Sequence, residues 1–299
     1  LWSAYRALKK ARDQRAPLEL NLPERRIVLD DQGHVTDVKL KPSFEANRLI
    51  EEFMIQANVA AGETLQESKL PTIYRVHGEP DPERLEATRA FLESMDYSLP
   101  KGQVLLPKNL NQILRIAEER DEVGLVSQVL LRAQRQAVYD TDNIGHFGLN
   151  LRRYVHFTSP IRRYADVTVH RGLIAALNLG KGGLSDDDAQ NLQKTAENIS
   201  DLERQSMAAE RESNDRFLAA WLEDRIGAEF AAHINGVTRA GMFITLDENG
   251  ADGFIPARTL GNEYFRHEEL LNALIGEQSG GVYRIGQPVR VRLKEVTPL

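Results

Sequence analysis

The sequence changes its hydrophobic pattern near Arg225, and this change constrains the fold more than any other feature. Before it, apolar residues recur at helical spacing over several long stretches, whereas after it short alternating runs separated by glycines predict strands. We therefore expect an α+β chain in which residues 1–224 form a helix-rich domain and residues 225–299 a second domain of strands. The chain has 299 residues, of which 41% are hydrophobic, so it is long enough to bury two cores.

Apolar periodicity and glycine or proline breaks predict several helices and a short hairpin in the first domain. The hairpin turn is expected at 31–33, where Asp-Gln-Gly separates two alternating runs. In the helix that begins near Ser43, an apolar stripe through Leu49, Phe53 and Ala57 leaves Glu52 away from its centre. The expected elements are strands at 18–22, 26–30 and 35–40 and helices from residue 2, from residue 43, and at 82–95, 109–119, 122–138, 160–177 and 186–224.

The run His-Phe-Thr-Ser-Pro-Ile-Arg-Arg-Tyr-Ala-Asp at 156–166 predicts a helix start that binds a phosphate. Ser159 suits the N-cap and Pro160 the first helical position, so the free N–H groups and the helix dipole would attract an anion beside Arg162 and Arg163. The alternative is an exposed helix start whose Arg162 pairs with Asp166 four residues later. Both interpretations stay open on the local pattern alone.

Glu210 is a second candidate, because it projects onto the apolar side of the long helix predicted at 186–224. At about 100° per residue, Glu210 falls in the middle of that apolar cluster. A carboxylate on an apolar stripe either pairs with an arginine or faces a catalytic cavity. The cluster consists of Leu192, Ile199, Met207, Phe217, Leu218 and Trp221.

The string HFTSPIRRYAD resembles, over eleven consecutive residues, the signature segment of the RNase II and RNase R exoribonucleases, the RNB family. The segments 47–60, 74–77 and 207–211 resemble further parts of that family, and the sequence of 145–149 is more similar to RNase R than to RNase II. The resemblance implies that residues 1–224 are the C-terminal portion of an RNB catalytic domain. It also implies that Arg162 and Glu210 contribute to phosphodiester cleavage.

The same resemblance implies three RNA contacts in the first domain. Ser159 and Arg163 belong to the signature, and Glu52 lies in the segment that follows the RNA channel in the family, near the ribose of the terminal nucleotides. For Glu52 a solvated position on a helix face is the alternative. Aspartates that bind Mg²⁺ in the family are expected upstream of Leu1, since Asp30 and Asp31 lie at a hairpin turn. No residue of this chain is therefore predicted to bind metal; the aspartates 186–188 and the pair of Asp166 and His170 are weaker candidates.

The second domain is predicted to be a five-stranded OB-fold barrel. Three strands are expected at 228–234, 241–246 and 253–255, with turns at 235–236 and 248–250, and a further strand near 283–291 that is cut short at the chain end. The segments 235–244 and 251–256 resemble the S1-type RNA-binding domain, which implies that Arg239 and Phe243 contact RNA. Ala240 and Pro256 stand where many such domains carry an aromatic residue and a histidine.

Composition restricts the partners. A net charge of −6 argues against non-specific coating of nucleic acid, so contacts must come from local basic patches such as 152–171. The sequence has no cysteine, which excludes disulfides and suits the cytoplasm, and no apolar run approaches membrane-spanning length. We expect a monomer that binds single-stranded RNA.

Together the resemblances imply a fragment of a processive 3′-5′ exoribonuclease that releases nucleoside 5′-monophosphates with Mg²⁺ as cofactor. Without the upstream aspartates, the segment alone is expected to bind RNA weakly and cleave it poorly. Two alternatives stay open: a non-catalytic RNA-binding relative of the family, or an unrelated phosphate-ester enzyme with a similar helix start.

Overall fold

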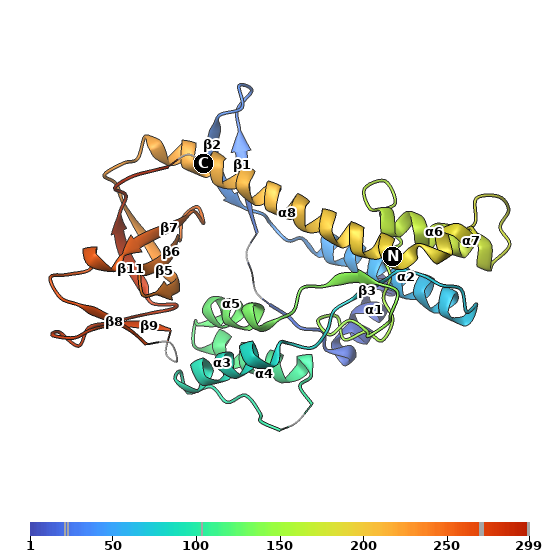
Figure 1. Ribbon diagram of the computed structural model, residues 1–299, viewed down its shortest axis with the longest axis horizontal. Helices are drawn as coiled ribbons and strands as arrows, with labels where there is room; N and C mark the ends of the chain where they lie inside the picture. The colour runs from blue at the N-terminus through green and yellow to red at the C-terminus, as the bar shows by residue number, and fades with distance from the viewer. Residues whose placement is uncertain (21, 23, 103, 269–271, 298–299) are drawn as a thin grey trace.

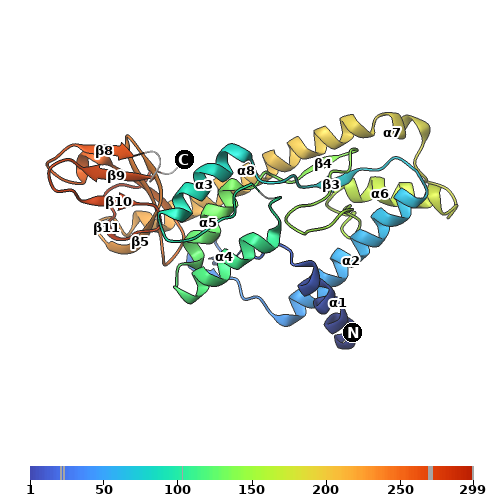
Figure 2. The ribbon, with the colours of Figure 1, turned by 90° about the horizontal axis from the view of Figure 1, so that it is seen from below.

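The chain folds into an elongated α+β molecule, which confirms the predicted fold class. The computed structural model describes residues 1–20, 22, 24–102, 104–268 and 272–297. Figures 1 and 2 show α2 and α6 at one end, the strands β5 to β11 at the other, and α3 to α5 and α8 between them. The helices are α1 (Trp2–Arg15), α2 (Glu45–Glu67), α3 (Pro82–Glu93), α4 (Pro107–Glu119), α5 (Val123–Ala133), α6 (Tyr164–Ala176), α7 (Asp186–Gln190) and α8 (Leu192–Glu223).

Within the described ranges, the helix-rich part forms two small sheets, and its two largest hydrophobic cores lie among its helices. One core joins α3, α4 and α5 around the fully buried Leu92, Leu110 and Leu130. The other packs α2 and α6 against β3 around Leu65 and Val169. The paired strands are β1 (Arg25–Leu29) with β2 (Val35–Leu40), the predicted hairpin, and β3 (Tyr74–Val76) with β4 (Val138–Asp140), both antiparallel.

The irregular segment 154–157 lies against β3 and so joins this second core. The backbone N–H of Arg75 donates to the carbonyl of Tyr154 at 2.8 Å, which fixes the segment beside the strand. Val155 is fully buried among the side chains of α2 and α6. The residues that follow are thereby held close to the N-terminus of α6.

The described residues of the C-terminal part form two antiparallel sheets, in the strand orders β11-β5-β6-β7 and β10-β9-β8. Their strands outnumber the five expected, because 265–284 contributes a separate three-stranded sheet. The core is built from inward-facing residues such as Ile234, Ile244 and Leu246. The strands are β5 (Glu229–Thr238), β6 (Gly241–Leu246), β7 (Asp252–Pro256), β8 (Phe265–Glu268), β9 (Ala273–Gly276), β10 (Val282–Arg284) and β11 (Pro288–Arg292).

The turn predicted at 235–236 is wrong. β5 continues through Asn235 and Gly236 as an irregularity in its pairing with β6, and the chain reverses at 239–240. The Asn235 amide donates to Thr245 Oγ1 at 2.6 Å and to Asp252 Oδ1 at 3.0 Å, so its side chain ties three strands together. An asparagine engaged across the sheet in this way stabilises the strand rather than a turn.

Three other boundaries differ from the sequence prediction. The described residues of 18–22 form no strand, and the expected helix at 186–224 is divided at Asn191 into α7 and α8. The helix predicted at 122–138 ends at Ala133, because 138–140 pairs with β3 instead. Within the described ranges, no helix combines the length and apolar character needed to cross a membrane.

Candidate nucleic-acid interface

Residues 158–163 form a turn ahead of α6 rather than its first helical turn. The carbonyl of Ser159 accepts from the backbone N–H groups of Arg162 and Arg163 at 3.3 and 3.2 Å, and α6 begins only at Tyr164. The predictions that Ser159 caps the helix and that Pro160 is its first residue are therefore wrong. The reason is that the N–H of Ser159 is bound by the carboxylate of Asp166 at 2.7 Å, which folds the chain around that side chain.

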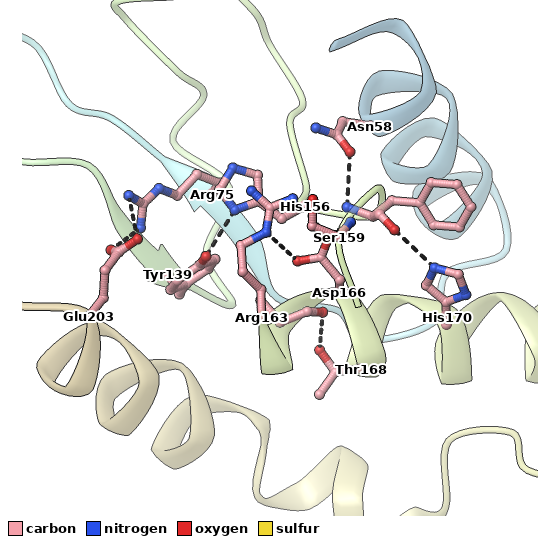
Figure 3. A network of polar contacts seen from close by, with 12 residues as sticks. Asn58, Arg75, Tyr139, His156, Ser159, Arg163, Asp166, Thr168, His170 and Glu203 are labelled. Carbon is pink, nitrogen blue, oxygen red and sulfur yellow. Dashed lines mark hydrogen bonds and ion pairs between the residues drawn. The ribbon is translucent and has the colours of Figure 1, made fainter. Parts of the chain in front are cut away.

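Asp166 is fully buried and binds Arg163, not Arg162. Its Oδ2 accepts from Nε of Arg163 and its Oδ1 from Nη2, both at 2.8 Å (Figure 3). The predicted pair of Arg162 and Asp166 is wrong, because three rather than four residues separate the true partners. Arg162 is exposed and makes no side-chain hydrogen bond or ion pair within the described part of the chain. One arginine of the signature thus holds the turn, and the other is presented to solvent.

A second group of polar side chains lies next to this turn and includes a carboxylate that the sequence analysis missed. Arg75 donates to both carboxylate oxygens of Glu203 at 2.6 and 3.1 Å, and its guanidinium carbon lies 4.6 Å from the ring centre of Tyr139. The hydroxyl of Tyr139 is 2.9 Å from Nδ1 of His156, as Figure 3 shows. Strands β3 and β4, helix α8 and the signature segment therefore meet in one cluster.

The cluster keeps its histidine and tyrosine neutral. Burial raises the pKa of Tyr139 to about 12. Burial, followed by the positive charges of Arg163 and Arg75, lowers the pKa of His156 to about 3. At neutral pH the cluster therefore carries the charges of its arginines and of their two carboxylate partners, Asp166 and Glu203. Arg162 adds a positive charge without a bound partner among the residues described.

The prediction that Glu210 faces inward is wrong. All side chains from 204 to 216 are exposed, so this stretch of α8 has no apolar side covered by the described residues. The described residues of this helix are buried only near its ends, at Leu192, Ala196, Ser200 and Leu222. Leu192 and Ala196 pack in one core with Tyr139, whereas Leu222 belongs to the core of the barrel. A projection averaged over the whole helix merges these two separate stripes into one. Near the N-terminal end of α8, the buried residues Leu192, Ala196 and Ser200 lie on the side that continues to the half-buried Glu203. Glu203 is about two turns before Glu210.

Glu52 is buried rather than solvated. Its side chain is 4% exposed and lies 3.4 Å from a guanidinium nitrogen of Arg12 in α1. Burial raises the pKa of Glu52, whereas the charges of Arg12 and Arg15 oppose that shift. Helix α1 thus covers this carboxylate, and the contact of Glu52 with RNA stays a prediction.

Two aromatic side chains mark an exposed face of the barrel. Phe243 in β6 and Phe254 in β7 are paired residues of adjacent strands, and each is 45% exposed. Their ring centres are 5.0 Å apart. Arg239 lies in the exposed turn between β5 and β6. Phe243 and Arg239 thus lie on neighbouring parts of the barrel, and Phe254 joins them although it was not predicted as an RNA contact.

The described residues contain no group of three or more histidine, aspartate or glutamate side chains that could hold a metal ion. Asp166 is bound to Arg163, and His170 contacts the carbonyl of Phe157 at 2.9 Å, so these two do not form a metal pair. Asp30 closes the hairpin turn, and Asp188 accepts from Ser185, the N-cap of α7, and pairs with Arg171. The side chains that the structure describes therefore do not fit a divalent-metal site.

Comparisons with known proteins give a consistent picture. Family models of the RNB domain and of the S1 RNA binding domain match residues 1–179 and 223–298. The chain is 34% identical over 305 residues to Ribonuclease R of Vibrio cholerae, a match that covers 99% of this chain and 37% of that protein. The chain thus spans less than half the length of this relative.

Solved structures of Mycoplasma genitalium RNase R are similar over nearly the whole chain. The apo form matches with a TM-score of 0.92 and 28% identity, covering 98% of this chain and 46% of that one. The complex with ribose methylated single-stranded RNA matches with a TM-score of 0.91 and 27% identity, with the same coverage.

Proposed function

The chain belongs to the RNB family, and on that premise we propose that it is the C-terminal part of a processive 3′-5′ exoribonuclease that hydrolyses single-stranded RNA to nucleoside 5′-monophosphates. The observation that carries the proposal is the contrast between two adjacent arginines. Arg163 is fixed by the buried Asp166, whereas Arg162 extends from the same turn into solvent with no bound partner among the described residues. A rigid turn that presents a free guanidinium is suited to a phosphodiester.

Arg162 is proposed to neutralise charge on the scissile phosphate as the phosphorane-like transition state forms. Arg163 and Ser159 take an indirect part, since their bonds to Asp166 set the path of the turn. The carboxylate role expected of Glu210 passes in this proposal to Glu203, which lies in the same polar cluster. The bidentate contact with Arg75 fixes the orientation of Glu203.

The barrel is proposed to bind the RNA strand upstream of the scissile bond. Exposed aromatic faces stack on bases of any sequence, and each stacked base contributes about 1–3 kcal/mol. Phe243 and Phe254 supply such faces. Arg239, in the turn between β5 and β6, is proposed to contact the phosphate backbone of the RNA.

The test is an Arg162→Ala variant of the full-length protein, compared with Arg115→Ala on the exposed side of α4 as a charge-matched control. Single-turnover cleavage of a 5′-labelled single strand in magnesium should slow by about a hundredfold or more, as expected for a group that acts mainly on the transition state. The dissociation constant for the same RNA should change little. A large loss of affinity with an unchanged chemical step would contradict the role, and an inactive parent protein would favour the non-catalytic alternative.

A further inference from the structure

Phe157, directly before the Thr158–Arg162 turn, has both of its backbone polar groups held by side chains from other elements. We propose that Asn58 and His170, which hold them, are positioning residues that set the turn for the phosphate; this proposal rests on the proposed function. Segment 154–157 belongs to no helix or strand, so its backbone N–H and C=O groups need hydrogen-bond partners from outside the segment.

Asn58 binds the segment from α2. Its Oδ1 accepts from the N–H of Phe157 at 2.9 Å, and its Nδ2 donates to the hydroxyl of Tyr154 at 2.9 Å. The side chain is 2% exposed, so no water competes for these bonds. One amide group thus fixes the segment at two points, three residues apart.

His170 binds the same residue from α6, as Figure 3 shows. Its Nε2 lies 2.9 Å from the carbonyl of Phe157, and because a carbonyl can only accept, Nε2 must carry the proton. The imidazole also stacks on the Phe157 ring, with centres 4.4 Å apart and planes 14° from parallel. Position and orientation of the Phe157 peptide are therefore both constrained.

The contacts of Asn58 and His170 with Phe157, which we call the clamp, are followed by a further contact within the turn. The next N–H but one, that of Ser159, is bound by Asp166, so residues on both sides of Thr158 are held by buried or half-buried side chains. The hydroxyl of Thr158 is itself buried and has no hydrogen-bond partner in the described part of the chain.

A fixed turn matters because Arg162 reaches the phosphate from it. Misplacing a reacting or stabilising group by about 1 Å can reduce a rate by about a hundredfold. Loss of the clamp should therefore reduce the rate of cleavage more than the affinity for RNA, most of whose contacts lie elsewhere.

Two variants at His170 separate the hydrogen bond from the ring contact. His170→Phe keeps the stacked ring and loses the donor, whereas His170→Gln keeps a donor near the position of Nε2 and loses the ring. In the full-length protein, single-turnover cleavage by His170→Phe should fall by about ten- to a hundredfold, with the RNA dissociation constant within about threefold of wild type. His170→Gln should recover most of the rate.

Asn58→Leu and Asn58→Asp give the same comparison from α2. Leucine removes both bonds, whereas aspartate can still accept from the N–H of Phe157 and from the hydroxyl of Tyr154. If Asn58→Leu does not fold, His170→Phe decides alone, because that site is half-buried and keeps its ring contact.

Amide hydrogen exchange at 158–163 in the 299-residue chain gives a readout that needs no activity. Exchange should accelerate in His170→Phe and stay near wild type in His170→Gln. Equal exchange and equal cleavage in all variants would overturn the proposal, as would rates and affinities that fall together without rescue by glutamine. A wild-type protein that cleaves no RNA but shows the exchange pattern would refute the proposed function and leave the clamp standing.

Discussion

Two adjacent arginines of this chain differ in how the fold holds them. Arg163 is 18% exposed and has a fully buried carboxylate partner, whereas Arg162, its neighbour, is exposed. The sequence presents the two as equivalent, since both follow the same Ser-Pro-Ile and both are within one turn of Asp166. The structure distinguishes them because a turn, not a helix, precedes Tyr164.

Asp166→Asn tests whether the ion pair of Asp166 and Arg163 stabilises the fold. The change leaves Arg163 without a counter-charge and weakens the acceptor of the Ser159 N–H. Breaking a buried pair on one side costs about 3–5 kcal/mol, so the free energy of unfolding, measured in urea, should fall by about that amount. Asp215→Asn, on the exposed part of α8, should change it by less than about 0.5 kcal/mol. A small loss at Asp166 would mean that the turn does not depend on this pair.

Two half-buried histidines, His146 and His156, predict a pH dependence of stability. Burial lowers the pKa of His146 and of His156 from 6.5 to about 3. The folded state therefore excludes a proton that the unfolded state binds below pH 6.5, so stability is full above that pH and is lost as pH falls toward 3. Each histidine contributes a slope of about 1.4 kcal/mol per pH unit in this window.

Urea unfolding at several pH values between 7 and 4 measures that slope. His156→Gln should flatten it by about 1.4 kcal/mol per pH unit, because glutamine does not titrate. The pKa values of Asp188 and Glu229 are lowered in the folded state, so the stability that these carboxylates contribute is lost as the pH falls through those values. This loss is common to the wild type and the variant. An identical slope in the variant would show that His156 is protonated in the folded state.

At the scale of elements, the sequence predicts which segments are helices or strands better than which face they bury. The position of α2 was predicted, but its buried side follows Leu49, Glu52, Ile55 and Asn58. Because Glu52 and Asn58 are polar, hydrophobic periodicity does not reveal this buried series. Their partners, in α1 and in 154–157, are distant in sequence. The same limit explains α8, where two cores at opposite ends were interpreted as one continuous stripe.

The barrel face gives a prediction at this scale. Phe243→Ala removes one of two adjacent exposed rings and should weaken binding of a fluorescent oligoribonucleotide by about 1–3 kcal/mol, that is, by about five- to 150-fold. Tyr264→Ala is the control, because that ring is more exposed and belongs to the segment before β8 rather than to β6 or β7. Equal effects of the two changes in fluorescence anisotropy would contradict a specific platform on β6 and β7.

At the scale of the molecule, the contact between the helical part and the barrel was not predictable from the chain. Ile285 packs with Phe91 and Val129, and Arg132 donates to the carbonyl of Asn235. None of these residues has a motif or spacing that signals its partner, since each contact joins segments more than a hundred residues apart. The division into helices and strands was visible in the sequence, whereas the way the two parts meet depends on shape.

Gly286 lies against Leu125 of α5 at that contact and gives the test of it. A Cβ atom there would lie 2.2 Å from Cδ2 of Leu125, and the backbone has φ of +84°. Gly286→Ala therefore adds a steric clash to the cost of a left-handed backbone. Gly280→Ala, at φ of +67° with nothing within 4 Å, isolates the backbone cost, which is about 1–2 kcal/mol.

We expect Gly286→Ala to lower the free energy of unfolding by about 1–3 kcal/mol more than Gly280→Ala does, because the added methyl overpacks the junction. If Leu125 is the obstacle, combining the change with Leu125→Ala should cost about 0.5–3 kcal/mol less than the sum of the single changes, whereas Gly280→Ala should add to Leu125→Ala without coupling. Additive losses at Gly286 and Leu125 would mean that the barrel does not rest on α5 in solution. The coupling energy thus measures the junction itself, since it cancels the cost that each change has on its own side.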